Sequence, residues 1–320
     1  MDMVHHDRDD GPLFCFRKAE SKDSFLWGSG ILREWKAFSY EESMRALEEM
    51  RRFQGWKIGF LNYDFGLLHE EVKSRHGGGA TPLLYFMAPK KVRVSHGVPR
   101  VGGVRSGIDF FAASVPKPQI SRDDYVSAVE KIHRLLKAGE TYQVNFSYPF
   151  SGTFEGSLWA FFQRLYDINP SPHACFLNFG GLAVACPALA VVSNSPERLL
   201  CGRRADDGGM WLETKPIKGT VGGEYKVWSM KYGEQGALNR MRKILGTEKH
   251  AAELDMIVDL ARNDLGKVSE YGSVHVVDHR KVEIYSHVAH TVSTVRGKLR
   301  EGLDWVDALM AVFPGGSVTG

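Results

Sequence analysis

The order of helix-like and strand-like segments after residue 120 constrains the fold more than any other feature of this chain. Residues 121–138 repeat apolar side chains at helical spacing, and residues 141–150 alternate apolar and polar side chains as a strand does. A long helix is predicted over residues 247–265. Shorter helices are predicted at about 156–167 and 304–312, and strands at about 174–214 and 272–299. This mixed order, without regular β-α-β alternation, predicts an α+β fold built on antiparallel sheets.

The first third of the chain gives a weaker pattern. Residues 1–113 contain short apolar runs separated by turn residues, and no helix longer than about three turns is evident. The proline-containing stretch 114–121 is typical of a linker. The sequence therefore predicts an N-terminal lobe over 1–113 and a second region over 114–320. Because the chain stops at a glycine-rich segment directly after a predicted helix, we expect it to be a fragment.

Charge and cysteine usage exclude several classes of protein. The formal net charge is +3, from 41 basic and 38 acidic side chains, which argues against a nucleic-acid-binding surface. The four cysteines form no C-x-x-C pair and are typical of reduced thiols. The start of the chain does not resemble a signal peptide, and no apolar run approaches the ~20 residues of a membrane helix. We expect a cytoplasmic protein.

One acidic side chain lies where the predicted long helix should be apolar. At ~100° per residue, Ile257 and Leu260 fall within about 60° of Glu253. An ionised carboxylate in such a stripe is costly unless it is paired, hydrogen-bonded or bound to a metal. A salt-bridged glutamate at the edge of the stripe and a ligand for Mg²⁺ both remain open from the pattern, since Mg²⁺ takes carboxylate oxygens.

Six segments in a fixed order resemble the chorismate-utilising family, which includes anthranilate, aminodeoxychorismate, isochorismate and salicylate synthases. They are AGETYQVNFS (138–147), SNSPERLL (193–200), TKPIKGT (214–220), AAELDMIVDLARNDLGKV (251–268), YSHVAHTVSTVRGKL (285–299) and FPGGSVTG (313–320). The first third matches only weakly, through LNYDFG (61–66). The resemblance implies two large antiparallel sheets packed face to face with helices outside, an N-terminal lobe of the anthranilate synthase component I type, and a site in a cleft.

The PIKGT segment distinguishes members of this family. Aminodeoxychorismate synthases carry a lysine where anthranilate and isochorismate synthases carry a small residue, so the resemblance implies that Lys218 is a nucleophile. The amine would attack ring carbon C2 while the C4 hydroxyl departs, before ammonia adds at C4. It must be uncharged to attack, which desolvation or a nearby cation such as Lys215 would favour. Taken alone, PIKGT would be read as a solvated lysine in a turn.

Glu197, in the segment SPE, matches the general acid that protonates the departing hydroxyl. Hydroxide is a poor leaving group, and an acid at that oxygen typically contributes 10²–10⁴-fold in rate. The acid must be protonated when substrate arrives, which a partly desolvated position would favour. Without the family context, a carboxylate paired with Arg198 at a strand end is the simpler interpretation.

The remaining candidate residues are also implied by the resemblance. Gly219, Thr220 and Ser317 match positions that contact the carboxylates or ring substituents of the substrate. His290 matches a histidine against the substrate ring, although a lone histidine on a strand face is more often a hydrogen-bonded core residue. Glu253 matches a metal-binding glutamate, and Mg²⁺ is the implied cofactor.

Gln143 bears on whether water could be the nucleophile that adds to the substrate ring. Isochorismate and salicylate synthases carry a lysine at the position of Gln143, where it activates water. Glutamine cannot act as that base, so water addition at C2 is disfavoured.

The resemblance is greatest to component I of the aminodeoxychorismate synthases. It implies conversion of chorismate and ammonia to 4-amino-4-deoxychorismate, for para-aminobenzoate and folate biosynthesis, with ammonia delivered by a glutamine amidotransferase subunit. Anthranilate synthase component I and a truncated non-catalytic relative are the alternatives. The family continues past the segment at 313–320 with about a hundred residues that supply a second metal glutamate and a substrate-binding arginine.

Overall fold

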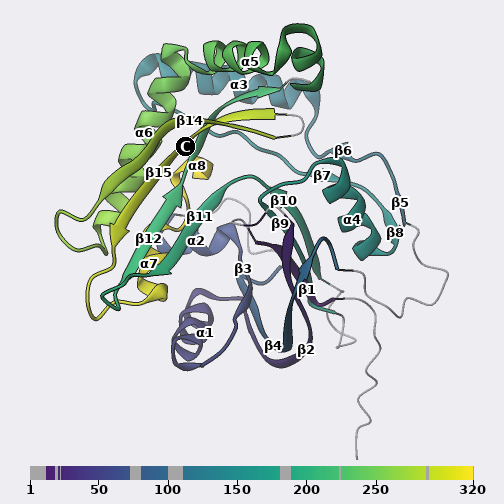
Figure 1. Cartoon of the computed structure of the whole chain (residues 1–320), viewed down its shortest axis with the longest axis vertical. Helices are drawn as coiled ribbons and strands as arrows, with labels where there is room; N and C mark the ends of the chain where they lie inside the picture. The colour runs from purple at the N-terminus through teal and green to yellow at the C-terminus, as the bar shows by residue number, and fades with distance from the viewer. Residues whose placement is uncertain are drawn as a thin grey trace, which may run out of the picture.

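The computed structural model describes residues 12–18, 21, 23–72, 81–99, 111–180, 189–222, 225–285 and 288–319. These residues form two large antiparallel sheets with helices packed on them, which confirms the predicted α+β class (Figure 1). None of the helices in these ranges combines the length and the apolar character that crossing a bilayer requires.

The first sheet has six strands among the described residues. Across the sheet they are β10 (Ala190–Ser195), β9 (His173–Asn178), β1 (Phe14–Arg17), β2 (Ser24–Ala37), β4 (Leu84–His96) and β3 (Ile58–Leu61). The long pair β2 and β4 runs in antiparallel register from Ser24 opposite His96 to Ala37 opposite Leu84. Two of the six strands follow residue 113, so this sheet includes segments from both sides of the predicted boundary.

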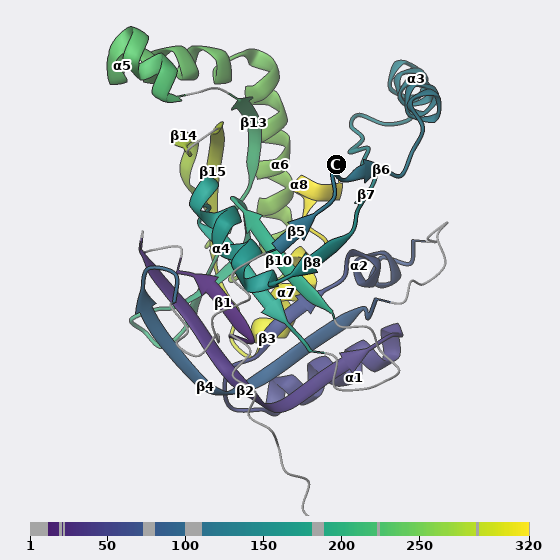
Figure 2. The ribbon, with the colours of Figure 1, turned by 90° about the vertical axis from the view of Figure 1, so that its right-hand side faces the viewer.

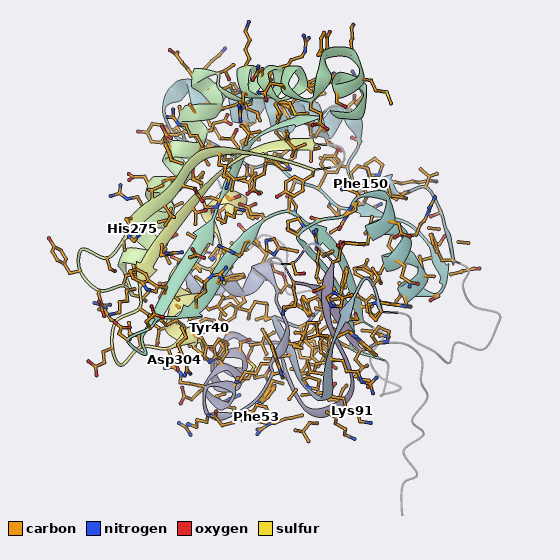
Figure 3. All side chains as sticks on the ribbon, viewed as in Figure 1. Tyr40, Phe53, Lys91, Phe150, His275 and Asp304 are labelled. Atoms are coloured by element: carbon orange, nitrogen blue, oxygen red, sulfur yellow. The ribbon has the colours of Figure 1, made fainter. Side chains whose placement is uncertain are left out.

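Helix α1 (Tyr40–Arg52) covers part of the first sheet and was not anticipated from the sequence. Its capping box is complete, because Ser39 and Glu42 each accept from the other's backbone N–H. Leu47 and Met50 are buried in one cluster with Trp35 of β2. Figure 3 shows this helix between the labelled side chains of Tyr40 and Phe53.

The second sheet has five strands in the described ranges. They are β11 (Arg198–Arg204), β12 (Met210–Lys215), β13 (Ile217–Gly222), β15 (Val288–Lys298) and β14 (His275–Ile284). Strands β12 and β13 both pair with β15 and meet at Pro216, which has no N–H to give to a ladder. Only Pro196 and Glu197 separate β10 from β11, so the chain crosses from one sheet to the other at this point.

Two helices give the second sheet its core. Helices α6 (Glu248–Gly266) and α7 (Trp305–Val312) match the predicted helices at 247–265 and 304–312. Leu254, Val258 and Leu265 of α6 are buried in one cluster with Val295 of β15 and Ala308 of α7. The apolar stripe of α6 therefore faces the sheet and α7, as its 3.6-residue period requires.

The other short elements complete the described part of the chain. Apart from α3, they are α2 (Tyr63–His69), β5 (Phe111–Ala113), β6 (Lys117–Pro118), β7 (Phe150–Ser151), β8 (Phe154–Gly156), α4 (Leu158–Ile168), α8 (Gly316–Thr319) and the longer α5 (Tyr225–Leu245). Helix α5, which the sequence analysis missed, is interrupted at Gly233, where φ is +70°.

Helix α3 (Arg122–Ala138) confirms the prediction over residues 121–138. Ser121 accepts from the Asp124 N–H at 3.1 Å, and Gly139 ends the helix in the left-handed conformation. None of its side chains is buried, although its apolar residues recur at helical spacing. Figure 2 shows α3 standing apart from both sheets.

The strand predicted over residues 141–150 is wrong for all but its last residue. Only Phe150 belongs to a strand, β7, and residues 141–149 have no regular structure. A strand needs a neighbouring backbone to pair with, and no described strand lies beside this segment. The alternating apolar side chains are consequently open to solvent, with Tyr142 92% exposed.

Candidate active site

Glu197 lies at the crossover between the two sheets. Its carboxylate oxygen Oε1 accepts the backbone N–H of Ile217 at 3.2 Å, and its own N–H donates to Ser195 Oγ at 3.2 Å. Arg198, the partner expected from sequence alone, donates instead to Glu213 at 3.3 Å. Among the described residues, the Glu197 carboxylate is therefore held beside the start of β13 by one backbone N–H and forms no ion pair.

Lys218 extends from β13 to the end of the described chain. Its Nζ donates to the backbone carbonyl of Ser317 at 3.1 Å. Lys215 forms an ion pair with Glu283 at 2.6 Å, and Tyr285 donates to the other oxygen of that carboxylate. The positive charge of Lys215 is thus balanced by Glu283, so Lys215 is not the free cation expected beside Lys218.

A β-bulge separates Lys218 from the next candidate residues. Lys218 is opposite Thr291 and Thr220 is opposite His290, so Gly219 is the extra residue in the ladder. Its φ of +80° favours glycine, and a Cβ there would lie 3.4 Å from the side chain of His250 on α6. The bulge brings the β13 backbone close to this helix.

His290 is nearly inaccessible, at 7% exposure, and hydrogen-bonds through Nδ1 to Thr220 Oγ1 at 2.9 Å. Burial lowers the pKa of His290, and this effect exceeds the opposing influence of Glu283 and of a hydrogen bond with the Gly219 backbone. A neutral imidazole is therefore expected at neutral pH. The pair of Thr220 and His290 joins β13 to β15 next to Lys218.

Glu253 lies on α6 three residues after His250, whose side chain is next to Gly219 of β13. Its side chain is 37% exposed, and the nearest recorded cation is Lys249 Nζ at 4.0 Å. The described residues contain no cluster of three His, Cys, Asp or Glu side chains that could hold a metal on their own. One accessible carboxylate still fits Mg²⁺, because this ion often takes one or two protein carboxylates and completes its shell with water or substrate oxygens.

A partly open chamber of about 300 Å³ lies against Glu197. We call this space the acid-lined chamber, because Glu197 and Asp264 both face it. Its walls are largely apolar and come from Leu61 of β3, from α6, and from residues 313–318. These residues lead into α8, and we call them the loop 313–318. Ser317 borders the chamber as well, so the loop that receives the Lys218 amine also closes the space beside Glu197.

The structure reveals one positioning residue that the sequence analysis did not select. Asn145 donates through Nδ2 to the carbonyls of Ser317 and Val318, at 3.0 and 2.7 Å. It lies in the QVN segment, and its place on the polar side of the alternating pattern was the available signal. Gln143, two residues earlier, has a buried Oε1 without a hydrogen-bond partner in the described structure.

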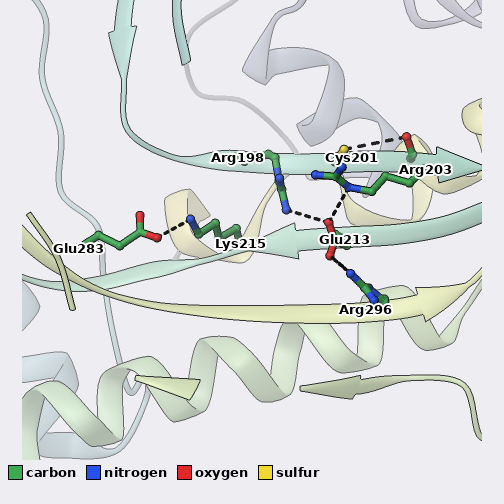
Figure 4. A network of polar contacts seen from close by, with 8 residues as sticks. Arg198, Cys201, Arg203, Glu213, Lys215, Glu283 and Arg296 are labelled. Atoms are coloured by element: carbon green, nitrogen blue, oxygen red, sulfur yellow. Dashed lines mark hydrogen bonds and ion pairs between the residues drawn. The ribbon is translucent and has the colours of Figure 1, made fainter. Parts of the chain in front are cut away.

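A buried ion network supports the strands that carry these residues. Glu213 of β12, whose side chain is 6% exposed, contacts Arg198, Arg203 and Arg296 at 2.6–3.3 Å (Figure 4). Burial alone would raise the pKa of Glu213, but hydrogen bonds from Arg296 and the charges of Arg296 and Arg198 hold it below its usual range. The carboxylate is the common partner of three cations on two strands, Arg198 and Arg203 on β11 and Arg296 on β15.

Replacing this carboxylate should therefore destabilise the protein. We expect Glu213→Gln to lower the free energy of unfolding at pH 7 by about 2–3 kcal/mol, because it removes the buried carboxylate that accepts charged hydrogen bonds from Arg198, Arg203 and Arg296. The folded-state pKa is depressed, so the contribution exists above the ordinary glutamate pKa of about 4.3 and is lost as pH falls through the folded value. Urea denaturation between pH 7 and pH 3 measures both effects.

A matched control is Asp259→Asn, which removes an exposed carboxylate paired with Arg262 at 3.0 Å. Exposed pairs contribute little, so this variant should unfold nearly as the parent does. Equal stability of both variants would contradict the role assigned to Glu213.

Comparison with known proteins places the chain in a family. Residues 109–320 match the model of the chorismate binding enzymes. The chain is 33% identical over 304 residues to aminodeoxychorismate synthase component 1 of Bacillus subtilis, covering 85% of this chain and 61% of that protein. It is 39% identical over 202 residues to an anthranilate synthase component 1 of Haloarcula marismortui, covering 62% of this chain and 37% of that protein.

A solved structure shows the same fold. Anthranilate synthase component I from Streptococcus pneumoniae TIGR4 superposes with a TM-score of 0.72 at 24% identity, covering 93% of this chain and 74% of that one. The match over residues 109–320 spans about two thirds of the chain, so the chain belongs to the chorismate binding enzyme family. It spans less than two thirds of the length of the two curated relatives described above.

Proposed function

We propose that this protein acts as an aminodeoxychorismate synthase component I, converting chorismate and ammonia to 4-amino-4-deoxychorismate. The observation that carries the proposal is Lys218 itself, in PIKGT, with its amine extended to the loop that also borders Glu197. A family member that only eliminates or hydrates chorismate has no use for a primary amine at this point. The identity of 33% to the Bacillus subtilis protein supports the same assignment.

The reaction exchanges a hydroxyl for an amine without oxidation or reduction. The nitrogen of Lys218 forms a bond to C2, the ring double bonds shift, and the bond between C4 and its hydroxyl breaks. Glu197 gives the proton with which that oxygen leaves as water. Ammonia then forms a bond to C4, the double bonds shift back, and the bond between C2 and the lysine nitrogen breaks. Two displacements keep the original configuration at C4.

The residues around Lys218 suit a dianionic substrate. The bulge at Gly219 opens backbone N–H groups to a carboxylate, and the hydroxyls of Thr220 and Ser317 are further donors. The neutral imidazole of His290 would contact the substrate ring without adding charge. Glu253 is the residue proposed to hold Mg²⁺, which would neutralise a substrate carboxylate when bound. Ammonia is proposed to come from a glutamine amidotransferase subunit.

Product analysis tests the proposal. The protein in its native length would be incubated with chorismate, ammonium and Mg²⁺, and the products separated by chromatography with mass detection. We expect 4-amino-4-deoxychorismate, and we expect turnover to rise with Mg²⁺ concentration. Anthranilate with pyruvate, or isochorismate, as the main product would overturn the proposal. Glutamine should replace ammonium only when an amidotransferase subunit is added.

The second candidate is anthranilate synthase component I. It is favoured by relatives of that name with comparable identity, including the protein from Haloarcula marismortui. That reaction aminates C2 and expels pyruvate, so an amine at residue 218 would occupy the path of the incoming ammonia. The two candidates differ in their response to substitution of Lys218, because only the first requires a nucleophile there.

A further inference from the structure

We propose that the acid-lined chamber is the binding site of the nitrogen nucleophile, and that ammonia reaches the reacting carbon from it by passing Glu197. This inference rests on the proposed function, since it concerns the second substrate of the same site. It assigns that substrate to a space that Ser317 and Glu197 border but that Lys218, Thr220 and His290 do not.

The chemistry of the chamber does not suit chorismate. Its ionisable lining includes two carboxyl groups, Glu197 and Asp264, and one guanidinium, Arg198, which is already engaged by Glu213. Asp264 is mostly buried and pairs with Lys267 at 2.9 Å. A dianion would meet the Asp264 carboxylate and largely apolar walls there, at a high cost in desolvation. A small neutral molecule such as ammonia does not meet these obstacles.

The position of the chamber separates it from the nucleophilic lysine. Lys218, Thr220, His290 and Glu253 do not border it, whereas Glu197 and the loop 313–318 do. A molecule in the chamber therefore approaches the site from the side of Glu197. The proposed chemistry needs this direction, because ammonia takes the place of the oxygen that Glu197 protonates at C4.

The size of the chamber also fits a solvent-like substrate. A volume of about 300 Å³ is well above the roughly 10–15 Å³ that a cavity needs to hold one water, so ammonia can enter with water. Two tight contacts define its wall. A Cβ on Gly315 would lie 2.8 Å from Leu199, and a Cβ on Gly316 would lie 2.2 Å from Leu260. The loop can close the chamber at this distance only because it carries glycines.

The test measures the KM for ammonium and the KM for chorismate separately. Ala261 borders the chamber on α6, and Ala261→Leu fills part of it, while Asp264→Asn removes a charge at nearly constant volume. With ammonium chloride as nitrogen source and the protein in its native length, we expect Ala261→Leu to raise the KM for ammonium about tenfold, the usual effect of a few methylene groups in a pocket. The KM for chorismate should stay within about twofold. Asp264→Asn should raise the KM for ammonium in the same selective way.

The control is Ala252→Leu, which adds the same side chain at an exposed position of the same helix and should change neither constant. The inference would be overturned if the KM values for ammonium and chorismate rose equally. It would also be overturned if the KM for ammonium rose in neither chamber variant. A wild-type protein that adds water rather than ammonia to chorismate would overturn it as well. Anthranilate as the wild-type product would overturn the proposed function and the approach past Glu197, because that reaction aminates C2. A selective rise in the KM for ammonium would still assign ammonia to the chamber, because both reactions consume it.

Discussion

Lys218→Ala is expected to reduce formation of 4-amino-4-deoxychorismate by about 10³-fold or more, because removing a covalent nucleophile leaves only binding and acid catalysis. The loss should fall on kcat rather than on the KM for chorismate. Initial rates over a range of chorismate concentrations at saturating ammonium measure the two constants separately. If the protein is instead an anthranilate synthase, the same substitution should leave its turnover intact.

The hydrogen bond between Lys218 and Ser317 requires a control for a purely structural role. Lys218→Arg keeps a positive charge and N–H donors for the Ser317 carbonyl but supplies no neutral amine at working pH. We expect Lys218→Arg to be as inactive as Lys218→Ala, and to unfold at the temperature of the parent protein. Full activity of the arginine variant would mean that Lys218 holds the loop 313–318 and does not attack the substrate.

A covalent intermediate gives a second readout on the same residue. Without ammonia, the parent protein should accumulate an adduct whose mass equals protein plus chorismate minus water. Peptide mapping should locate the added mass on Lys218. Addition of ammonium should discharge it, since ammonia completes the second displacement. An adduct on another residue would contradict the mechanism.

Glu197→Gln is expected to lower kcat by 10²–10⁴-fold, the range typical of losing a general acid. The amide oxygen can still accept the Ile217 N–H, so the local backbone contact seen at 3.2 Å is preserved while the transferable proton is lost. The rate of adduct formation in the absence of ammonia should fall by the same factor, because departure of the hydroxyl belongs to the first displacement. Rapid-mixing mass measurements follow this step directly.

Two comparisons show whether the fall in kcat of Glu197→Gln is specific to its role as an acid. Glu270→Gln changes an exposed carboxylate paired with Lys298 at 3.4 Å and should leave kcat unchanged. Chorismate binding to Glu197→Gln, measured without turnover, should match the parent within about threefold if the residue acts only on the leaving group. A large loss of affinity with an unchanged rate constant would instead assign Glu197 to substrate binding.

Local sequence patterns predicted those parts of the fold that depend on neighbours along the chain. The stripe of Leu254, Val258 and Leu265 on α6 repeats every three to four residues, and the cap at Ser121 needs only residues within one turn. The six segments that resemble the family also carried the correct assignment to it.

Alternation of side chains along residues 141–150 was misleading for the opposite reason. Period-two alternation states which faces a strand would have, but not whether another backbone is available to pair with it. In the described structure no strand lies beside residues 141–149. Local patterns also could not assign β9 and β10 to the first sheet. Strand β9 pairs with β1, about 160 residues earlier, and β10 joins the sheet by pairing with β9.

The sequence by itself determined the kinds of groups available: an amine at residue 218, carboxyls at 197 and 253, an imidazole at 290 and glycines where the backbone must turn. The tertiary structure alone decided their partners. In the folded chain Lys218 donates to Ser317, and Lys215 forms an ion pair with Glu283. Arg198 pairs with Glu213, and Glu197 borders the acid-lined chamber. Residue type follows from local chemistry, whereas the partner of a charge depends on which distant strand the backbone ladder places beside it.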